Sequence, residues 1–502
     1  MNHEDDVVDD DEGELVPLGA ALERVDAARA EAELRLAEQL TDSSNAERWV
    51  ELHGERFRWH PGRERWMVWS GSRWALDDAG EALRTTKDVA ASWMLRDAVV
   101  KAKSAAELRG FELHAKRSGS ASARVAMLRL AQAEQGMSVA TDQWDADPWL
   151  LNVANGVLDL RTGRLQAHRP GEYQTKLAPV AYDPDARAPV FERFLEQALP
   201  ANDVRAFVAR SLGYALTGVV REHVLPVWYG AGGNGKGTLQ NAVSGVLGDY
   251  AKAVPADLMM RRTGGDQHPT ERAMLMGLRL AFASETEAGR QLAESTVKSL
   301  TGGDPITARF MRQDFFTFLP SHKLILSTNH RPIIRGNDAG IWRRVRLVPW
   351  ETTPRTIDTT LGEQLAREGP GILRWLVEGC LAWQRDGLGS AASIDEATRA
   401  YRHEQDVCSA FLEECTTRTA DAKTSSAELY AAYRAWCAEA GERHWTQRAF
   451  VAALQERGLD RVKAHGTMTY RGLGLLADRP GASAADRELG RRYGREAAAA
   501  DD

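Results

Sequence analysis

The stretch that decides the fold is LPVWYGAGGNGKGTLQNAVSGVL, residues 225–247. Its first part, Leu225–Tyr229, is a short apolar run that predicts a buried strand. A glycine-rich GxxxxGK loop follows at 230–236, and Leu239–Leu247 has the apolar periodicity of a helix. Strand, loop and helix in this order let backbone N–H groups wrap phosphates at the positive end of a helix. The segment therefore predicts an α/β core with a nucleotide site.

Within this loop, Lys236 can reach the β- and γ-phosphates of ATP. The next residue is Gly237 instead of the usual Ser or Thr, so either Thr238 holds Mg²⁺ or acids and water do. GKGT also occurs in adenylate-kinase-like proteins, which keeps a small-molecule kinase as an alternative. The expected nucleotide-binding residues are Gly230, Gly232, Gly233, Asn234, Gly235, Lys236, Gly237, Thr238 and Leu239.

Polar residues end two later strand-like runs. Leu278–Ser284 is followed by Glu285, an acid expected beside the loop strand, where it could orient Mg²⁺ or polarise water. We predict Thr238 and Glu285 as metal ligands and leave open whether Glu287 replaces Glu285. Lys323–Thr328 is followed by Asn329, whose amide could sense the γ-phosphate.

An arginine pair, Arg343 and Arg344, precedes the apolar run Val345–Val348. Such a pair could be a surface patch. In ring ATPases it supplies an arginine finger to the neighbouring subunit, an effect on the order of 10³–10⁵ in rate. We favour Arg343 over Arg344. With these, the expected catalytic set is Lys236, Glu285, Asn329, Arg343 and Arg344.

With these motifs in place, the chain resembles the superfamily 3 helicases, and the phage/plasmid primase–helicases most closely. The resemblance is strong over about 140–350 and looser over 400–475. It rests on GAGGNGKGT (230–238), RLAFASETE (279–287), LTGGDPITARFMRQDFFTF (300–318), LILSTNHRP (324–332) and GIWRRVRLVPW (340–350), with LLNVANGVLDLRTG (150–163) and SLGYALTG (211–218) before them.

The resemblance implies a P-loop, AAA+-like core that assembles as a hexameric ring, binds ATP and Mg²⁺ at subunit interfaces and moves along single-stranded DNA. It also implies a channel hairpin between Ile306–Met311 and Phe315–Phe318, with residues 312–314 at its tip. Arg309 and Arg312 would contact phosphates there. Forked DNA, a polymerase and a primase are further expected partners.

The C-terminal part resembles the family's winged helix. Residues 425–440 and 446–457 are predicted helices, Thr446 is a candidate N-cap, and 462–473 form a strand–turn–strand. In this fold the second helix enters a DNA groove, although a protein-binding role fits almost as well. The expected DNA contacts are Gln447, Arg448, Lys463 and His465.

The predicted fold class is multidomain α/β: a parallel-sheet ATPase core flanked by an α+β N-terminal region and a small winged-helix domain. A Trp-rich β-meander at 49–78 interleaves aromatics with arginines, and we favour a compact core over a base-stacking surface there. The expected segments are 1–14 acidic tail, 15–140 N-terminal region (helical at 15–48), 141–220 pre-motor domain, 221–355 ATPase core, 356–415 helical extension, 416–476 winged helix and 477–502 disordered tail.

Charge and composition set further limits. The net charge is −7, but residues 1–14 carry eight acids and no Lys or Arg, so the rest is close to neutral. We read this tail as disordered, with mimicry of DNA as a less favoured alternative. The sequence contains neither a membrane span nor a secretory signal, which predicts a cytoplasmic protein. The four cysteines predict buried thiols.

The expected activity is DNA-stimulated ATP hydrolysis with duplex unwinding. The alternatives are a P-loop kinase, an ATP-gated scaffold that binds nucleic acid without unwinding it, and an RNA motor. We expect no primer synthesis, because only about 140 residues precede the match and the nearest DxD, Asp145–Asp147, lies in a Trp/Pro-rich turn.

Overall fold

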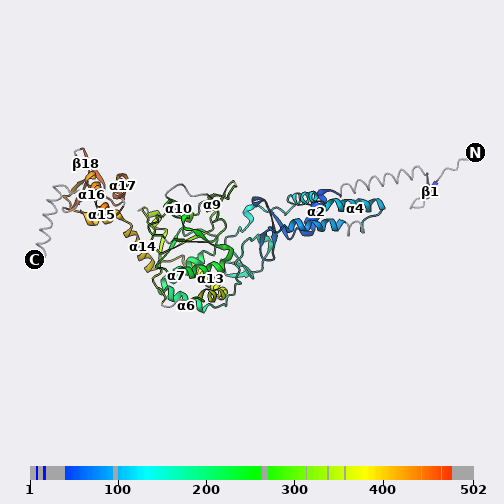
Figure 1. Cartoon of the computed structure of the whole chain (residues 1–502), viewed down its shortest axis with the longest axis horizontal. Coiled ribbons are helices and arrows are strands. Elements are labelled where there is room, and N and C mark those ends of the chain that lie inside the picture. The colour runs from blue at the N-terminus through cyan, green and yellow to red at the C-terminus, as the bar shows by residue number, and fades with distance from the viewer. Residues whose placement is uncertain are drawn as a thin grey trace, which may run out of the picture. The chain divides into compact units, whose positions relative to one another are not determined.

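The computed structural model describes residues 7–9, 15–17, 40–93, 100–262, 269–285, 287–312, 314–335, 339–354, 358–442, 444–464 and 466–476. Two compact units divide the chain: unit 1 holds 1–159 and 164–182, and unit 2 holds 160–163 and 183–502 (Figure 1). The predicted pre-motor domain 141–220 is therefore split, because its strands fold into unit 1 and its helices pack into unit 2. The multidomain α/β class with a parallel-sheet core is confirmed.

Unit 1 is a helical bundle with two antiparallel meanders. The first meander places Trp66 and Trp74 in the core, while Trp59 and Trp69 are half-buried, so the core interpretation of the tryptophans holds for two of these four. The second meander buries Leu151 and Leu158. The elements are α2 (Asp42–His53), β3 (Phe57–His60), β4 (Arg65–Trp69), β5 (Trp74–Leu76), α3 (Glu81–Ser92), α4 (Ala105–Ser118), α5 (Ala121–Ala131), β6 (Leu150–Val153), β7 (Gly156–Asp159) and β8 (Arg164–Gln166).

The N-terminal segment differs from both expectations made for it. Strand β1 (Val7–Asp9) pairs antiparallel with β2 (Leu15–Pro17), where a disordered tail and then a helix were predicted. The β-branched residues Val7, Val8 and Val16 favour strands, which explains the difference. Most of the helix predicted at 15–48, and the tail 477–502, lie outside the described residues.

The centre of unit 2 is a five-stranded parallel sheet in the order β10-β11-β14-β9-β15. Side chains alternate between its faces: Val227 and Leu326 join one core cluster, whereas Trp228 packs on Phe282 and Trp350 on the other face. The strands are β9 (Leu225–Tyr229), β10 (Ala251–Pro255), β11 (Leu280–Glu285), β14 (Lys323–Thr328) and β15 (Val345–Pro349).

Helices cover both faces of this sheet. In Figure 1, α9 and α10 lie on one side, and α6, α7 and α13 lie on the other. Helices α7 and α13 cross closely, because a Cβ on Gly213 would lie 2.1 Å from Cys380 N and one on Gly379 would lie 2.2 Å from Ala209 O. The helices are α6 (Pro189–Ala198), α7 (Asn202–Tyr214), α8 (Lys236–Leu247), α9 (Pro269–Ala273), α10 (Glu294–Thr301), α11 (Ala339–Trp342), α12 (Leu361–Arg367), α13 (Gly369–Asp386) and α14 (Ala392–Glu404).

Two cations, the buried Arg279 and the half-buried Lys323, join the end of α7 to the sheet. Arg279 precedes β11 and donates to Leu216 O at 2.6 Å, and Lys323 begins β14 and donates to Thr217 O. Carbonyls at a helix C-terminus carry partial negative charge, so cations are stabilised there. Burial lowers the pKa of Lys323 well below its usual value.

The strand register aligns the carboxyl edge of the sheet. Glu285 lies opposite Thr328, and Thr328 lies opposite Tyr229, the last residue before the glycine loop. Strand β11 was expected directly beside β9, but β14 lies between them. The correction follows from pairing: β14 hydrogen-bonds to both strands, so Asn329 is nearer the loop strand than Glu285 is.

The C-terminal part of unit 2 has a core of its own. Helix α15 contributes Cys408, Phe411 and Cys415 to it, so this helix belongs here and not to the predicted extension 356–415. Thr446 caps α17 by accepting from Ala449 N at 3.4 Å, as predicted. The elements are α15 (Val407–Cys415), β16 (Thr416–Thr417), β17 (Lys423–Ser425), α16 (Ser426–Glu439), α17 (Gln447–Glu456), β18 (Arg461–Ala464), β19 (Thr467–Arg471) and β20 (Gly474–Leu475).

All four cysteines, Cys380, Cys408, Cys415 and Cys437, are buried and free, as predicted for core thiols. Within the described residues, none of the helices has both the length and the apolar character needed to span a bilayer.

Candidate nucleotide site and nucleic-acid contacts

A cavity of about 1110 Å³ opens at the carboxyl edge of the parallel sheet. It brings together the glycine loop, the ends of β11 and β14, and two helices. The lining residues are Val190, Arg193, Phe194, Gln197, Ala198, Gly232, Gly233, Asn234, Gly235, Lys236, Gly237, Thr238, Ser284, Glu285, Ser327, Thr328, Asn329, Thr352, Thr353, Pro354, Asp358, Leu361 and Gln364.

The glycine loop owes its shape to a left-handed residue at the start of α8. Gly235 has φ 94°, a conformation that side chains rarely adopt. A Cβ at this position would also lie 3.0 Å from the Phe194 ring and 3.3 Å from Ala198 Cβ. Helix α6 therefore supports the loop from outside, and Lys236 begins α8 at the positive end of its dipole.

The Lys236 ammonium is held by the loop itself. Its Nζ donates to Gly230 O at 2.6 Å, to Ala231 O at 3.2 Å and to Asn234 Oδ1 at 3.1 Å. Asn234 is fixed in turn, because its Nδ2 donates to Trp350 O at 2.6 Å. Burial lowers the pKa of Lys236 from its usual value. The side chain is thus placed against the loop where phosphates would bind.

The two candidate acids have different environments. Glu285 is buried and lines the cavity, and its Oε1 accepts a hydrogen bond from Glu287 N at 2.9 Å. The Glu287 side chain is 71% exposed and does not line the cavity. This geometry favours Glu285 as the acid that faces a nucleotide.

Asn329 lines the same cavity at the end of β14. Its backbone is fixed by a tight turn in which Thr328 Oγ1 accepts from His330 N at 3.1 Å and donates to His330 O. The strand end and this turn aim Asn329 at the cavity.

The oxygen donors present fit a magnesium ion. Thr238 and Glu285 both line the cavity, and Mg²⁺ is usually held by one or two such oxygens together with substrate phosphates and water. Among the residues that the structure describes, no group of three or more His, Cys, Asp or Glu forms a dedicated metal cage. The set therefore matches a metal delivered with a nucleotide.

Two expected nucleotide contacts do not line the cavity. Leu239 is fully buried and anchors α8 in the core, and Gly230 faces Lys236 with its carbonyl. Conversely, sequence reasoning missed the wall formed by α6 and the segment after β15. Those residues, Arg193, Gln197, Thr352 and Asp358 among them, belong to no local motif and meet the loop only in the fold.

The arginine pair separates into two roles. Arg344 is 8% exposed, and it donates from Nη1 to Gly340 O at 2.8 Å and from Nε to Thr301 Oγ1 at 3.2 Å. Arg343 is exposed. Both precede the amino end of β15, whereas the cavity lies at the carboxyl end, about 16 Å away for five strand residues. Neither arginine lines the cavity of its own chain.

The predicted hairpin is formed by β12 (Ile306–Arg309) and β13 (Phe315–Phe318). The first strand ends two residues earlier than expected, so the tip is longer. Arg312 is exposed there at φ 60°, and Gln313 lies outside the described residues. The tip is also apolar, which sequence reasoning missed: its exposed side chains are Phe310 (43%), Met311 (75%) and Phe315 (60%), and Leu319 (72%) is exposed at the base of the hairpin.

In the C-terminal part, Gln447 and Arg448 are exposed at the start of α17, and Lys463 is exposed on β18. His465 lies outside the described residues. The two cations are thus placed on a helix start and on a hairpin strand.

The DxD residues serve the local fold. Asp145 Oδ1 accepts from Thr175 N at 2.8 Å, and Asp147 Oδ1 accepts from Trp149 N at 2.9 Å. Asp145 therefore joins two separate segments of unit 1, and Asp147 stabilises a local turn.

Three family models match the chain. "D5 N terminal like" matches 46–200, a "family of unknown function (DUF5906)" matches 228–344, and "Poxvirus D5 protein-like" matches 403–458. The middle match contains the glycine loop, Glu285, Asn329 and Arg343, and the last contains Arg448.

Relatives in large DNA viruses agree with these matches. "Putative helicase L207/L206" of Acanthamoeba polyphaga mimivirus is 26% identical over 58% of this chain and 33% of its own length. "Putative primase C962R" of African swine fever virus (strain Badajoz 1971 Vero-adapted) is 26% identical over the same shares. The chain thus spans about a third of the length of these relatives. A solved structure, the A-form apo C-terminal region of NrS-1, shares 9% identity at a TM-score of 0.45 and covers 85% of this chain and 99% of its own.

Proposed function

We propose that this chain, which belongs to the D5-like primase–helicase family, hydrolyses ATP to translocate along single-stranded DNA. One observation carries the proposal: Lys236, Glu285 and Asn329 line a single cavity at the carboxyl edge of a parallel sheet, while Arg343 is exposed at the opposite edge. This is the arrangement of an ATPase whose site is completed by a neighbouring copy.

In the proposed reaction, a water molecule attacks the γ-phosphate in line, and the bond to the β–γ bridging oxygen breaks to give ADP and phosphate. Lys236 offsets the phosphate charge, Glu285 accepts a hydrogen bond from the water, and Asn329 contacts the γ-phosphate. Thr238 and Glu285 would hold Mg²⁺, whose charge offsets that of the phosphate oxygens.

The position of Arg343 supports assembly. Strand β15, about 16 Å long, separates Arg343 from the cavity edge, so its exposed guanidinium is better placed for the cavity of a neighbouring subunit than for its own. We therefore propose a closed homo-oligomer, a hexamer by the family resemblance, with ATP at each interface. Arg344 instead holds α11 and α10 together through Gly340 and Thr301.

The proposed DNA contacts lie on the β12–β13 hairpin and on the C-terminal part. Arg312 and Arg309 would contact phosphates, and the exposed Phe315 offers a ring for base stacking. Arg448 and Lys463 would contact forked or double-stranded DNA. The printed names of the relatives support a nucleic-acid substrate, and competition between DNA and RNA strands would identify which one is preferred.

The first experiment measures ATP hydrolysis with and without single-stranded DNA at rising protein concentration. We expect DNA to stimulate hydrolysis and specific activity to rise with concentration, because assembly completes the site. Lys236→Ala should abolish nucleotide binding, and Glu285→Gln should keep binding but abolish turnover. A rate of ATP hydrolysis that changes neither with DNA nor with protein concentration would favour a phosphotransferase.

A mixing experiment tests the shared site directly. Arg343→Ala and Lys236→Ala should each be inactive alone. Mixed together, some interfaces pair an intact Lys236 loop with an intact neighbouring Arg343, so part of the activity should return. A mixture as inactive as its parts would contradict a site shared between subunits.

The absence of primer synthesis stays a prediction, because one relative is named as a primase and the chain matches only a third of it. A templated primer assay on the purified chain tests it. A polymerase or a primase as replication partner also stays a proposal.

A further inference from the structure

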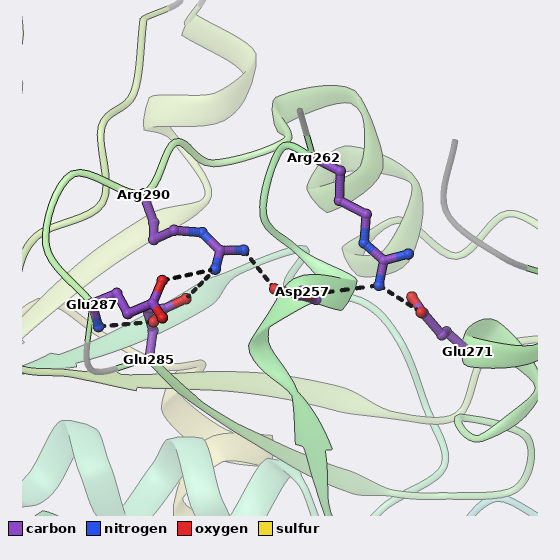
Figure 2. Close-up of polar contacts among 6 residues, drawn as sticks. All are labelled: Asp257, Arg262, Glu271, Glu285, Glu287 and Arg290. Carbon is purple, nitrogen blue, oxygen red and sulfur yellow. Dashed lines mark hydrogen bonds and ion pairs between the residues drawn. The ribbon is translucent and has the colours of Figure 1, made fainter. Parts of the chain in front are cut away.

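A cluster of charged side chains lies around Glu285, near the carboxyl ends of β10 and β11 (Figure 2). Arg290 is at its centre. Its Nη1 lies 3.7 Å from Glu285 Oε2 and 3.3 Å from Glu287 Oε2, and its Nη2 lies 2.5 Å from Asp257 Oδ1. The guanidinium thus lies close to the acid that faces the cavity and, at the same time, contacts an acid that follows the neighbouring strand β10.

We propose that Arg290 is a positioning residue that holds the Glu285 carboxylate where it can accept a hydrogen bond from the water that attacks the γ-phosphate, and that Asp257 fixes Arg290. The inference rests on the proposed ATP hydrolysis. None of the sequence motifs contains this role, because Arg290 and Asp257 are 33 residues apart and meet only when β10 and β11 pair.

The Glu285 carboxylate has one firm hydrogen bond in the cluster. Its Oε1 accepts from Glu287 N at 2.9 Å, while the contact of Oε2 among the described residues is with Arg290 Nη1 at 3.7 Å, beyond hydrogen-bond distance. Because the Glu285 side chain is 8% exposed, little water screens this attraction. Without Arg290 the carboxylate would be free to rotate about one backbone contact.

Asp257 is suited to hold Arg290 because of where it sits. It lies just after β10, and the register places Pro255 opposite Ser284, the residue before Glu285. The hydrogen bond from Arg290 lowers the pKa of Asp257, so this acid stays charged at neutral pH. The planar guanidinium can then direct one nitrogen at Asp257 and the other toward Glu285.

Arg262 provides a matched control. Its Nη2 also faces Asp257, at 3.6 Å, but its close partner is Glu271 at 2.6 Å. It is 28% exposed, against 27% for Arg290, and it makes no contact with Glu285 in Figure 2. Arg262→Ala therefore removes one positive charge from a side chain of similar exposure and leaves the surroundings of Glu285 unchanged.

The test compares Arg290→Ala, Arg290→Lys, Asp257→Asn and Arg262→Ala in the full chain with saturating single-stranded DNA. Turnover, KM for ATP, affinity for a fluorescent ATP analogue and melting temperature are measured for each. We expect Arg290→Ala to lower kcat roughly ten- to a hundredfold, with analogue affinity unchanged within about twofold. Arg290→Lys should restore part of the turnover, and Arg262→Ala should match the wild type.

Asp257→Asn should lower kcat by a smaller factor, and adding it to Arg290→Ala should cause no further loss, since both act through one contact. Wild-type turnover in Arg290→Ala, equal losses in Arg262→Ala, or a loss confined to nucleotide affinity would each overturn the inference. If the wild type turns over ATP and Glu285→Gln does not, the proposed function stands whatever Arg290 does. A wild-type protein that hydrolyses no ATP would contradict both the proposed function and the role of Arg290.

Discussion

Arg343 and Arg344 are adjacent in sequence and opposite in environment. Arg344 is buried and donates to Gly340 O and Thr301 Oγ1, while Arg343 is exposed. The sequence could not separate them, because each fits the same motif position. Only the fold shows which guanidinium is used internally.

We expect Arg344→Ala to lower the free energy of unfolding by about 2 kcal/mol, because it leaves buried acceptors without their donor. Arg343→Ala should leave the melting temperature unchanged and lower the rate of ATP hydrolysis instead. Thermal denaturation followed by circular dichroism measures the first effect. Equal melting temperatures for the two variants would contradict the assignment.

A buried histidine, His322, should make the free energy of unfolding depend on pH. Its Nε2 donates to Leu300 O at 3.0 Å, and among the described residues its Nδ1 has no hydrogen-bond partner. Burial lowers the pKa of His322 to about 4. The unfolded chain therefore binds a proton first, near pH 6.5, and the folded chain binds one only near pH 4.

From this histidine we predict that about 3 kcal/mol of stability is lost as the pH falls from 6.5 to 4, a range in which the unfolded state holds more protons. His322→Gln keeps a donor for Leu300 O and does not titrate, so its stability should fall less over the same range. Urea unfolding at several pH values checks this. Parallel pH curves for the two proteins would show that other groups are responsible.

At the level of single elements, the β12–β13 hairpin combines charge with aromatic surface. Arg309 lies over the Phe315 ring at 5.1 Å, and Phe310 stacks on Phe316 with ring centres 5.0 Å apart. Sequence reasoning identified the hairpin through the family pattern and emphasised its arginines. It could not show that Phe315 and Met311 are exposed, since large apolar side chains are more often buried.

The two kinds of contact on this hairpin predict different losses of DNA affinity. Arg312→Ala should reduce the slope of log affinity against log salt by about one, because one phosphate contact is lost. Phe315→Ala should weaken binding by about 1–3 kcal/mol without changing that slope, because stacking releases no counterions. Fluorescence anisotropy with a labelled oligonucleotide at several salt concentrations measures both. Thr317→Ala, an exposed change on the same strand, is the control.

Motifs that are continuous in sequence were predictable, and arrangements between distant segments were not. The strand, glycine loop and helix around Lys236 followed from local pattern alone. The insertion of β14 between β9 and β11 did not, because strand order depends on pairings across the sheet. The support of Gly235 by Phe194, and the transfer of α15 to the C-terminal core, also depend on tertiary contacts.

On the scale of the whole molecule, the C-terminal part has its own core and its own internal ion pair. Arg457 Nη2 contacts both oxygens of Asp406, at 2.6 and 2.7 Å, and so ties the residue before α15 to the end of α17. An ion pair in which both side chains are 16% exposed is better protected from solvent than an exposed pair.

We predict that a fragment of residues 403–476 folds by itself and unfolds cooperatively, although a domain of this size is only marginally stable. The complementary chain, which ends at residue 402, should keep ATP hydrolysis and lose affinity for forked DNA. Circular dichroism of the fragment checks the first prediction. Assays of ATP hydrolysis and DNA binding on the truncated chain check the second. A fragment without cooperative unfolding would show that this core needs the rest of unit 2.

The three hydrogen bonds that Lys236 makes within its own loop have a consequence for turnover. The Lys236 ammonium already donates three hydrogen bonds, to Gly230 O, Ala231 O and Asn234 Oδ1. A phosphate that binds there replaces some of these bonds and adds few new ones. Exchange of this kind limits the net gain on binding. When the product leaves, the Lys236 ammonium forms its hydrogen bonds with the loop again, which offsets the bonds lost to the phosphate. In the ATPase proposed above, a small net gain on binding would ease the release of ADP and phosphate in each cycle.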